Sequence, residues 1–367
     1  MPSSVSAQPQ LFFGNRRHDR QARQRLLRKK NLRVVDEYKT ALSELCAIRE
    51  PGLRGQPSAL KKAQTAFVSA HRGKRTLDDC GVWVYYPWDR TLVHCLDRAL
   101  HEELRTARNK YLITEREQEL FRDFPIAIAG LSVGSHAALT IALQGGGSYD
   151  MRLADPDSIA PSNLNRIRSG VRFIGTNKAV AVAQEVYAMN PYAGLRIFSD
   201  GVTALNMRRF LTKPKRAGVL IEEMDNLALK FSIRILARRL RIPVISAADN
   251  GDGVVLEVER YDQDPSLPLF GGRLHGIDRA AIARATLPEA ASIIGRIVGK
   301  GVVTPRMNAS VKAIGHSLYS WPQLGGAATL AGVVLAYAAR MIATGLPLKS
   351  GRTVFSLEKL LSFGKIQ

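Results

Sequence analysis

Apolar runs of strand length alternate with helix-length segments over much of this chain. Four such runs follow residue 115: Ile126–Ala129, Met151–Ala154, residues 219–221 and residues 244–245. Apolar strands separated by helices are typical of a parallel sheet that is covered by helices on both faces. The pattern therefore predicts an α/β fold with a doubly wound, mostly parallel sheet.

The chain before residue 115 has a different pattern. Residues 32–35 and 82–88 have the composition of strands, and residues 37–48 that of a helix. In the last hundred residues we expect a strand at 257–261 and helices at 277–300 and 327–344. The predicted organisation is a small, basic N-terminal α+β module (1–104), a main α/β domain (105–350) and a C-terminal tail (351–367).

One long stretch, residues 317–339, carries no charged side chain and has the length of a membrane span. It contains Pro322, Gln323 and the pair Gly325 and Gly326, and it is rich in Ala. We therefore predict a buried helix that starts after the proline and no membrane span. Because no apolar stretch follows Met1, we expect no signal peptide, and the three scattered cysteines favour a cytoplasmic protein.

Cysteine is scarce, and the three cysteines are Cys46, Cys80 and Cys95. None forms a C-x-x-C pair, so neither a disulfide framework nor a structural zinc site is indicated. We expect no zinc.

Positive charge is concentrated near the N-terminus. The formal net charge is +21, and nine of the nineteen residues from Asn15 to Arg33 (15–33) are Lys or Arg. Such a run can bind nucleic acid, anionic lipid or an acidic protein tail, or it can be a solvated helix face. Interleaved aromatic residues would favour nucleic acid, and this run has none.

The first apolar run of the main domain leads into a glycine turn with Gly130, Ser132 and Gly134, followed by an Ala-rich segment. A glycine turn between a strand and a helix can point backbone N–H groups and the positive end of the helix at a phosphate. The turn is one residue shorter than G-x-G-x-x-G, and Ser132 stands where the second glycine is expected. Ordinary dinucleotide binding is therefore poorly supported.

The same turn also fits a hydrolase nucleophile elbow, in which Ser132 would be the nucleophile. Residues for the rest of a triad follow in the expected order: Asp225 or Asp249, then His275 or His316. This remote alternative gives no role to Asp155, Arg166 or Lys178.

Asp155 follows the second apolar run, where an acidic side chain of a doubly wound sheet faces the ribose of a bound nucleotide. Asp157, two residues later, fits a turn or helix cap. Arg166 and Lys178 then offer a forked donor and a point charge to phosphate oxygens. Together these residues predict a polyphosphate site.

The next strand ends near Glu222 and Glu223, and Asp225 follows. A carboxylate at the C-terminal end of such a strand lies in the ligand crevice, where it can hold Mg²⁺ against phosphate oxygens. We favour Asp225 as this ligand, although it could instead cap the helix that starts near Leu227.

Three segments together closely resemble the ThiF/MoeB-like adenylyltransferases, the bacterial relatives of ubiquitin-activating enzymes. They are Asp155-x-Asp157 with Asn163-Leu164-Asn165-Arg166, then Gly175-x-x-Lys178-Ala179, then Met224-Asp225-Asn226. The resemblance covers about two thirds of the chain. It implies a Rossmann-like fold and an enzyme that uses ATP to activate a carboxylate as an acyl-adenylate, with release of pyrophosphate.

The resemblance also implies roles for single residues. Asp155 matches the ribose-binding residue of the family, Arg166 and Lys178 match the cations on the phosphates, and Asp225 matches the residue that supports Mg²⁺. The residues implied to bind the nucleotide are Gly130, Ser132, Gly134, Asp155, Asp157, Asn163 and Asn226. Arg105 and Arg108 match an Arg-x-x-Arg segment that reaches into the partner subunit's site, so a homodimer in which they act in trans is expected.

Two departures from the family shape the expected reaction. The glycine turn is shortened, and no cysteine follows Cys95, so the domain has no nucleophile for the thioester step of some relatives. The acyl-adenylate would pass directly to its acceptor.

The segments around Trp88 and Trp321 resemble a bacterial subgroup that is sometimes fused to a nitroreductase-like domain. The alternatives are an ATP-binding scaffold without turnover and a related tRNA-modifying dehydratase.

Overall fold

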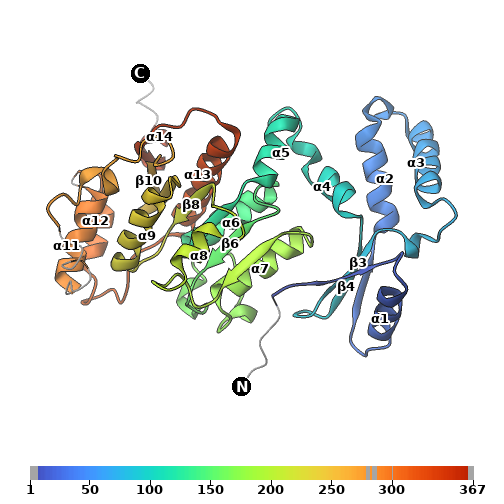
Figure 1. The fold of residues 1–367 in the computed structure, drawn as a ribbon, viewed down its shortest axis with the longest axis horizontal. Helices are drawn as coiled ribbons and strands as arrows, with labels where there is room; N and C mark the ends of the chain where they lie inside the picture. Colours follow the sequence, from blue (N-terminus) through green and yellow to red (C-terminus); the bar gives the residue numbers. More distant parts are fainter. Residues whose placement is uncertain (1–6, 278–281, 283–286, 300, 363–367) are drawn as a thin grey trace. The chain divides into compact units, whose positions relative to one another are not determined.

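The computed structural model describes residues 7–277, 282, 287–299 and 301–362, and the chain forms two compact units (Figure 1). The first unit contains Met1–Glu115 and Asn190–Tyr192. The second contains Arg116–Met189 and Ala193–Gln367.

The first unit has a four-stranded sheet in the order β1-β3-β4-β2. Its strands are β1 (Gln10–Phe13), β2 (Arg33–Asp36), β3 (Val82–Tyr86) and β4 (Thr91–Cys95). Its helices are α1 (Arg17–Leu27), α2 (Tyr38–Arg49), α3 (Pro57–Arg72) and α4 (Arg98–Thr106), with short 3₁₀ turns at Pro51–Leu53, Leu77–Asp79 and Ala107–Asn109. The strands predicted at 32–35 and 82–88 and the helix predicted at 37–48 are confirmed as β2, β3 and α2.

The core of the first unit is built around a stacked histidine. The ring of His94 lies between the rings of Tyr38 and Trp83, with centroid distances of 4.1 and 4.3 Å. Its Nδ1 lies 2.9 Å from Oδ1 of Asp36 and its Nε2 lies 2.9 Å from the carbonyl oxygen of Cys80. The stack therefore joins α2 and β2 to β3 and β4.

The second unit has a seven-stranded sheet in the order β11-β10-β9-β8-β5-β6-β7. Its strands are β5 (Ile126–Ala129), β6 (Met151–Ala154), β7 (Leu195–Phe198), β8 (Val219–Glu222), β9 (Val244–Asn250), β10 (Gly253–Glu259) and β11 (Gly351–Ser356). The pairs from β7 to β9 are parallel, whereas β10 pairs antiparallel with both β9 and β11. The predicted doubly wound, mostly parallel sheet is thus confirmed, and residues 351–356 of the expected tail form its edge strand.

Helices cover both faces of this sheet. The helices after the first unit are α5 (Glu115–Asp123), α6 (Val133–Leu143), α7 (Lys178–Met189), α8 (Met207–Thr212), α9 (Leu227–Arg239), α11 (Leu287–Val298), α12 (Pro305–Lys312), α13 (Gly325–Thr344) and α14 (Leu357–Leu361). One face packs against α6, α7 and α13, and the other packs against α8 and α9 around Phe210 and Ile233. The helix predicted at 277–300 is represented by α11, while residues 278–281, 283–286 and 300 lie outside the described part.

The helix α13 is long and apolar enough to span a membrane by length and composition. Half of its most apolar window is buried inside the unit, where it packs against α6, β9 and β10. A Cβ added at Gly332 would lie 2.3 Å from Cβ of His136 in α6, so the two helices meet at a point where only glycine fits. These contacts are those of a core helix, which agrees with the buried helix predicted after Pro322.

The order of the strands creates a switch point between β5 and β8. The chain moves from β5 to β6 and β7 on one side, and then crosses back to β8 and β9 on the other. In open α/β sheets the ligand binds beyond the carboxyl ends of the strands at such a point. The residues after Ala129 and Glu222 are therefore the first place to look for a site.

Candidate functional site

The glycine turn and Asp155 are joined at the carboxyl ends of β5 and β6. Oδ2 of Asp155 accepts a 2.7 Å hydrogen bond from the N–H of Leu131, and its Oδ1 accepts one of 2.9 Å from the N–H of Asp157. Burial raises the pKa of the Asp155 carboxyl, while Lys178 and these two N–H groups act in the opposite direction. Asp155 thus fixes the turn, and the N–H of Leu131 points at this carboxylate.

The turn has little room for side chains. Gly130 has φ of 88°, and a Cβ there would lie 2.3 Å from the carbonyl oxygen of Glu223. Gly134 lies in the first turn of α6, where a Cβ would lie 3.0 Å from Cγ2 of Ile128. The two glycines therefore allow β5, the residues after β8 and the start of α6 to approach each other closely.

Lys178 begins α7 and reaches back to the same two aspartates. It is 8% exposed, and its Nζ donates a 2.9 Å hydrogen bond to Oδ2 of Asp157 and lies 3.8 Å from Oδ1 of Asp155. A nearly buried ammonium group is stable only with such partners. The structure therefore brings Asp155, Asp157 and Lys178 together at the carboxyl ends of the strands.

Arg166 contacts the glycine turn from the loop after the 3₁₀ turn Pro161–Asn163. Its Nε donates a 3.1 Å hydrogen bond to Oγ of Ser132, and its Nη1 donates to the carbonyl oxygen of Ser162 and to Oδ1 of Asn165. Burial lowers the pKa of Arg166, whereas the charges of Asp249 and Asp225 raise it. The guanidinium therefore lies between the turn and two carboxylates from the next two strands.

The hydrogen bonds do not form the hydrolase triad. The hydroxyl of Ser132 accepts from Arg166, and among the described contacts neither His275 nor His316 reaches it. A serine without a neighbouring base is a weak nucleophile. The arrangement thus fits an anion-binding turn better than a nucleophile elbow.

Two predicted nucleotide-binding asparagines have structural partners. Oδ1 of Asn163 accepts a hydrogen bond from the N–H of Ala160, and Oδ1 of Asn226 accepts one of 3.0 Å from the N–H of Leu229. Asn226 is therefore the N-cap of α9. The sequence also allowed Asp225 to cap this helix, but the neighbouring Asn226 is the residue that does so.

Asp225 is the acidic residue at the end of β8 that remains available. Glu222 is buried and pairs with Lys230 and Arg234, which keep its pKa below its ordinary value. Oε1 of Glu223 accepts from the N–H of Ala247. Asp225 is exposed, and its carboxylate acts on Arg166 through its charge but forms no hydrogen bond or close ion pair among the described residues.

Asp249, at the end of β9, belongs to the site although the sequence pointed to it only as a triad member. Its Oδ2 accepts a 3.0 Å hydrogen bond from Nε2 of Gln323, and its buried Oδ1 has no partner in the described part of the chain. Burial raises the pKa of Asp249 to about 6. Asp225 was selected because it is a carboxylate near the end of a strand of the sheet, and the same criterion would have selected Asp249. No feature of the sequence indicates a role for Gln323.

The segment before α13 covers this part of the site. Nδ2 of Asn165 donates a 2.9 Å hydrogen bond to the carbonyl oxygen of Gln323, and a Cβ at Gly325 would lie 2.5 Å from the carbonyl oxygen of Asn165. Gln323 therefore links the loop of Arg166 to Asp249.

Arg105 and Arg108 belong to the first unit and have different surroundings. Nε and Nη2 of Arg105 donate to Oε2 of Glu102 at 3.0 and 2.8 Å, and Oε1 of Glu102 accepts from Nδ2 of Asn190 at 2.7 Å. Arg108 lies in a 3₁₀ turn and is exposed. Of the two, Arg108 has the side chain that can reach another molecule.

The three cysteines are also in the first unit. Cys46 and Cys80 are buried and Cys95 is half-buried, and burial raises the pKa of Cys95 to about 12. A thiol with such a pKa is almost entirely protonated at neutral pH and is a poor nucleophile.

Comparison with known proteins gives the family of the second unit. The family model described as the ThiF family matches residues 105–303, more than half of the chain. This chain belongs to the ThiF family. The match contains the glycine turn, Asp155, Arg166, Lys178 and Asp225.

Two curated relatives cover different shares of the chain. The uncharacterized protein MT1398 of Mycobacterium tuberculosis (strain CDC 1551 / Oshkosh) is 34% identical over 276 residues, which are 75% of this chain and 38% of that protein. The tRNA threonylcarbamoyladenosine dehydratase of Escherichia coli strain K12 is 27% identical over 171 residues, 44% of this chain and 62% of that enzyme. The chain thus spans less than two thirds of the length of either relative. The crystal structure of the E. coli dehydratase TcdA matches with a TM-score of 0.47 and 22% identity, over 66% of this chain and 95% of that one.

Proposed function

We propose that this chain is an ATP-dependent adenylyltransferase that activates a carboxylate as an acyl-adenylate. The observation that carries the proposal is that Asp155, which lies beside Lys178, and Arg166 both bind the glycine turn after β5, while the charge of Asp225 acts on Arg166. In this family member the four residues come from four separate segments. Their convergence supports a site built for a nucleotide and its phosphates.

In the proposed reaction a carboxylate oxygen of the substrate attacks the α-phosphorus of ATP. A new P–O bond forms, the bond to the β-phosphate breaks, and pyrophosphate leaves with the electron pair. Arg166 and Lys178 would stabilise the negative charge that builds up on the phosphate oxygens, and the N-terminal end of α6 would add to this effect. To reach the phosphates, Lys178 would exchange Asp157 for a phosphate oxygen.

Asp225 fits Mg²⁺ because a single exposed carboxylate beside the phosphates is the usual protein contribution to such a site. No group of three or more His, Cys, Asp or Glu side chains arranged for a metal is found among the described residues, which suits an ion held mainly by the substrate's phosphates. When bound there, the ion would neutralise phosphate charge. Asp155 would orient the ribose, with Gly130, Ser132 and Gly134 shaping the turn.

The further parts of the proposal concern the partners. Arg108, with Arg105 behind it, would complete the site of a second copy in a homodimer. The acyl-adenylate would be transferred directly, since no cysteine follows Cys95. We also propose membership of the subgroup that is sometimes fused to a nitroreductase-like domain, and a place in the cytoplasm.

A second candidate function is a tRNA-modifying dehydratase, and the likeness to the E. coli dehydratase favours it. It would use the same activation step on a carboxylate carried by tRNA.

ATP–pyrophosphate exchange tests these proposals. The full chain is assayed with a panel of small carboxylic acids, peptides with free C-termini, and total tRNA. Exchange with an acid or peptide supports the adenylyltransferase, and exchange with tRNA alone supports the dehydratase. If ATP binds and no member of the panel gives exchange, the chain is an ATP-binding scaffold and the proposed activity is wrong.

A further inference from the structure

The first unit, which lies largely outside the ThiF match, carries a basic helix with one side fixed to the sheet. Arg23 and Leu26 of α1 are 5% and 7% exposed. Nη1 of Arg23 donates a 2.9 Å hydrogen bond to the carbonyl oxygen of Asp78, and its guanidinium lies 5.0 Å from the ring centroid of Trp83. Arg23 and Leu26 therefore hold α1 in place, together with Arg20, whose Nη1 donates a 2.9 Å hydrogen bond to the carbonyl oxygen of Gly14, and the opposite side of the helix faces solvent.

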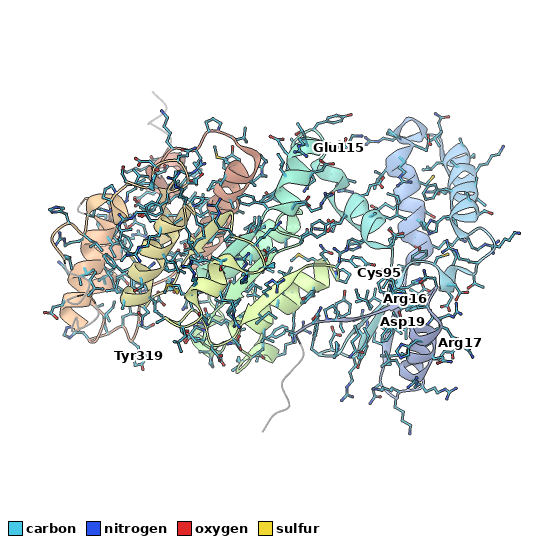
Figure 2. The ribbon with its side chains drawn as sticks, viewed as in Figure 1. Arg16, Arg17, Asp19, Cys95, Glu115 and Tyr319 are labelled. Carbon is cyan, nitrogen blue, oxygen red and sulfur yellow. The ribbon has the colours of Figure 1, made fainter. Side chains whose placement is uncertain are left out.

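The exposed side of α1 with its N-cap Arg16, the turn after it and Arg33 at the start of β2 form what we call the α1 basic surface. Figure 2 shows Arg16, Arg17 and Asp19 where this helix begins. Seven cationic side chains of the surface are exposed and form no ion pair within the described residues: Arg16, Arg17, Arg25, Arg28, Lys29, Lys30 and Arg33. Asp19, the acidic residue of this stretch, accepts from the N–H of Phe13 and lies beside His18. The positive charge of the surface is thus not neutralised locally.

The donors lie along one side of the helix. Arg17, Arg25 and Arg28 follow each other at helical spacing with Gln21 and Gln24 between them, and all five are exposed. At 1.5 Å per residue they span roughly 16 Å, which is the rise of about five nucleotides along one strand. Arg and Gln side chains are common donors to phosphate oxygens and to base edges.

Other partners fit this surface less well. A helix that lies on a lipid surface places large apolar side chains next to its cations, and a protein interface has apolar anchors. Leu26 of α1 is buried and Leu27 is 46% exposed, so the exposed side offers a single partly exposed leucine among Arg and Gln.

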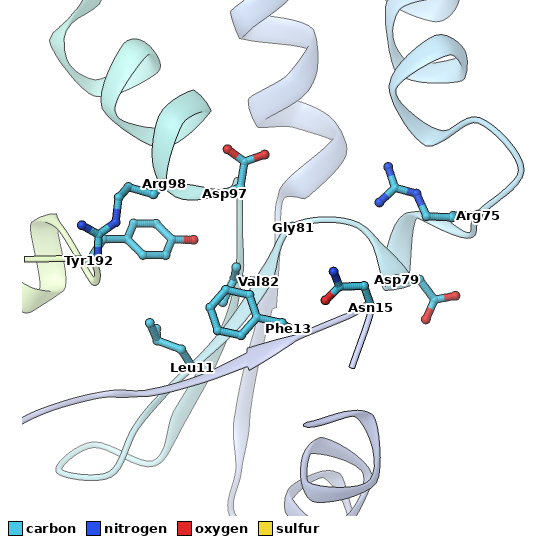
Figure 3. A pocket seen from close by; sticks show the side chains of 10 residues that line it. All are labelled: Leu11, Phe13, Asn15, Arg75, Asp79, Gly81, Val82, Asp97, Arg98 and Tyr192. Atoms are coloured by element: carbon cyan, nitrogen blue, oxygen red, sulfur yellow. The ribbon is translucent and has the colours of Figure 1, made fainter. Parts of the chain in front are cut away.

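A nearby cavity of the same unit lacks the positive charge that would favour a polyanion. A cavity of about 290 Å³ opens beside Phe13 and Asn15, and it is lined by Asp79 and Asp97 as well as by Arg75 and Arg98 (Figure 3). The two carboxylates offset the two guanidinium groups, so the lining has no excess of positive charge to attract phosphate groups.

We propose that the α1 basic surface binds the phosphate backbone of nucleic acid. The inference does not depend on the adenylation chemistry, because its residues precede the part of the chain that matches the ThiF family. Contacts to phosphates give affinity with little sequence preference and with a strong dependence on salt.

Fluorescence anisotropy with the full chain tests the proposal. The probes are labelled 20-nucleotide single strands and 20-base-pair duplexes of RNA and DNA, at 50 to 200 mM salt. We expect a plot of log affinity against log salt with a slope of about −4 for the duplexes. The variant Arg17→Gln/Arg25→Gln/Arg28→Gln should bind at least roughly ten-fold more weakly and reduce the magnitude of that slope by about 3.

The matched control is Arg54→Gln/Lys61→Gln/Lys62→Gln, which removes three exposed cations from the loop before α3 and from α3 itself. It should bind as the wild type does, and circular dichroism should show both variants folded. The proposal is wrong if the wild type does not bind the probes at 100 mM salt, or if both triple variants lose the same affinity. Tighter binding to phosphatidylserine vesicles than to any nucleic acid, lost in the α1 variant, would assign the surface to membranes instead.

Discussion

Nε2 of Gln323 donates a 3.0 Å hydrogen bond to Oδ2 of Asp249, and this bond connects the segment before α13 to the end of β9. The other carboxylate oxygen is buried without a partner in the described part of the chain. Asp249 is thus a carboxyl group near Arg166 with only one of its two oxygens hydrogen-bonded among the described residues.

The stability of the protein should respond to the protonation of Asp249. Its pKa is raised to about 6, above the value near 3.9 of an unfolded chain. Between these values the folded protein keeps a proton that the unfolded chain has lost, so stability falls as pH rises from about 4 to about 6. Over this range the free energy of unfolding of the wild type should fall by roughly 2 to 3 kcal/mol because of Asp249, and this contribution should be absent in Asp249→Asn. Urea unfolding at pH 4, 5, 6 and 7 measures it, and an unchanged difference between variant and wild type across this range contradicts the prediction.

Removal of Arg166 should abolish activation without unfolding the protein. With a carboxylate that supports exchange in the wild type, Arg166→Ala should lower ATP–pyrophosphate exchange by about 10² to 10³, since a cation on the developing charge is lost. Arg168→Ala, at an exposed position two residues later, is the control and should keep wild-type exchange. Comparable losses in the two variants would remove Arg166 from its proposed role.

The carboxylate of Asp225 should act through magnesium. Asp225→Asn should raise the Mg²⁺ concentration needed for half-maximal exchange by at least roughly ten-fold, because a charged ligand becomes a neutral one. Asp200→Asn, also exposed, should leave the magnesium titration unchanged. If the titration curve of Asp225→Asn overlays that of the wild type, another residue holds the ion.

Arg105 and Arg108 should give different phenotypes. Arg105→Ala removes the ionic partner of Glu102, whose side chain is 12% exposed, and should cost about 3 kcal/mol of stability. Arg108→Ala should keep the stability of the wild type and lose exchange. Thermal unfolding of the two variants separates these outcomes.

Mixing tests whether Arg108 acts in trans. When Arg108→Ala and Arg166→Ala subunits, each inactive alone, are refolded together, half of the dimers are mixed and each has one intact site. About a quarter of the wild-type exchange should return. No recovery, with mixed dimers detected by mass spectrometry, contradicts action in trans.

The contact of α13 with α6 predicts opposite effects of two glycine substitutions. At Gly332 a Cβ would overlap the backbone and Cβ of His136, so Gly332→Ala should destabilise the protein by about 2 kcal/mol or more. At Gly326, in the same helix, nothing lies within 4 Å of such a Cβ, and Gly326→Ala should stabilise by up to about 1 kcal/mol. Chemical denaturation checks both, and equal effects would mean that the two helices do not pack as described.

The centre of the fold was predictable because β5, β6, β8 and β9 each contain an apolar run, whereas the sequences of β7 and β11 give no such signal. Ile126–Ala129 and Met151–Ala154 are strands with the predicted bounds. The positions of Asp155 and Lys178 follow from the strand and helix that carry them, so their meeting was predictable too. The contact of Gln323 with Asp249 was not, because it joins residues far apart in sequence and depends on how the segment before α13 crosses the site.

Local hydrogen bonding also determines which residue caps α9, and the sequence pattern could not predict this. Asp225 and Asn226 are both good helix caps by type, and the sequence does not say which of them is used. The N–H of Leu229 donates to the side chain of Asn226, so Asn226 is the cap. The carboxylate of Asp225 therefore remains available to another partner.

The ion pair of Arg105 with Glu102 has a consequence for any attempt to divide this protein. Glu102 also binds Asn190, and the hydroxyl of Tyr192 donates to the carbonyl oxygen of Leu96, although residues 190–192 lie between α7 and β7 in the chain. A fragment that starts at residue 116 would keep Asn190 and Tyr192 but lose both of their partners. No single cut yields two self-contained pieces, so the first unit is best studied, and exchanged between relatives, together with that three-residue insertion.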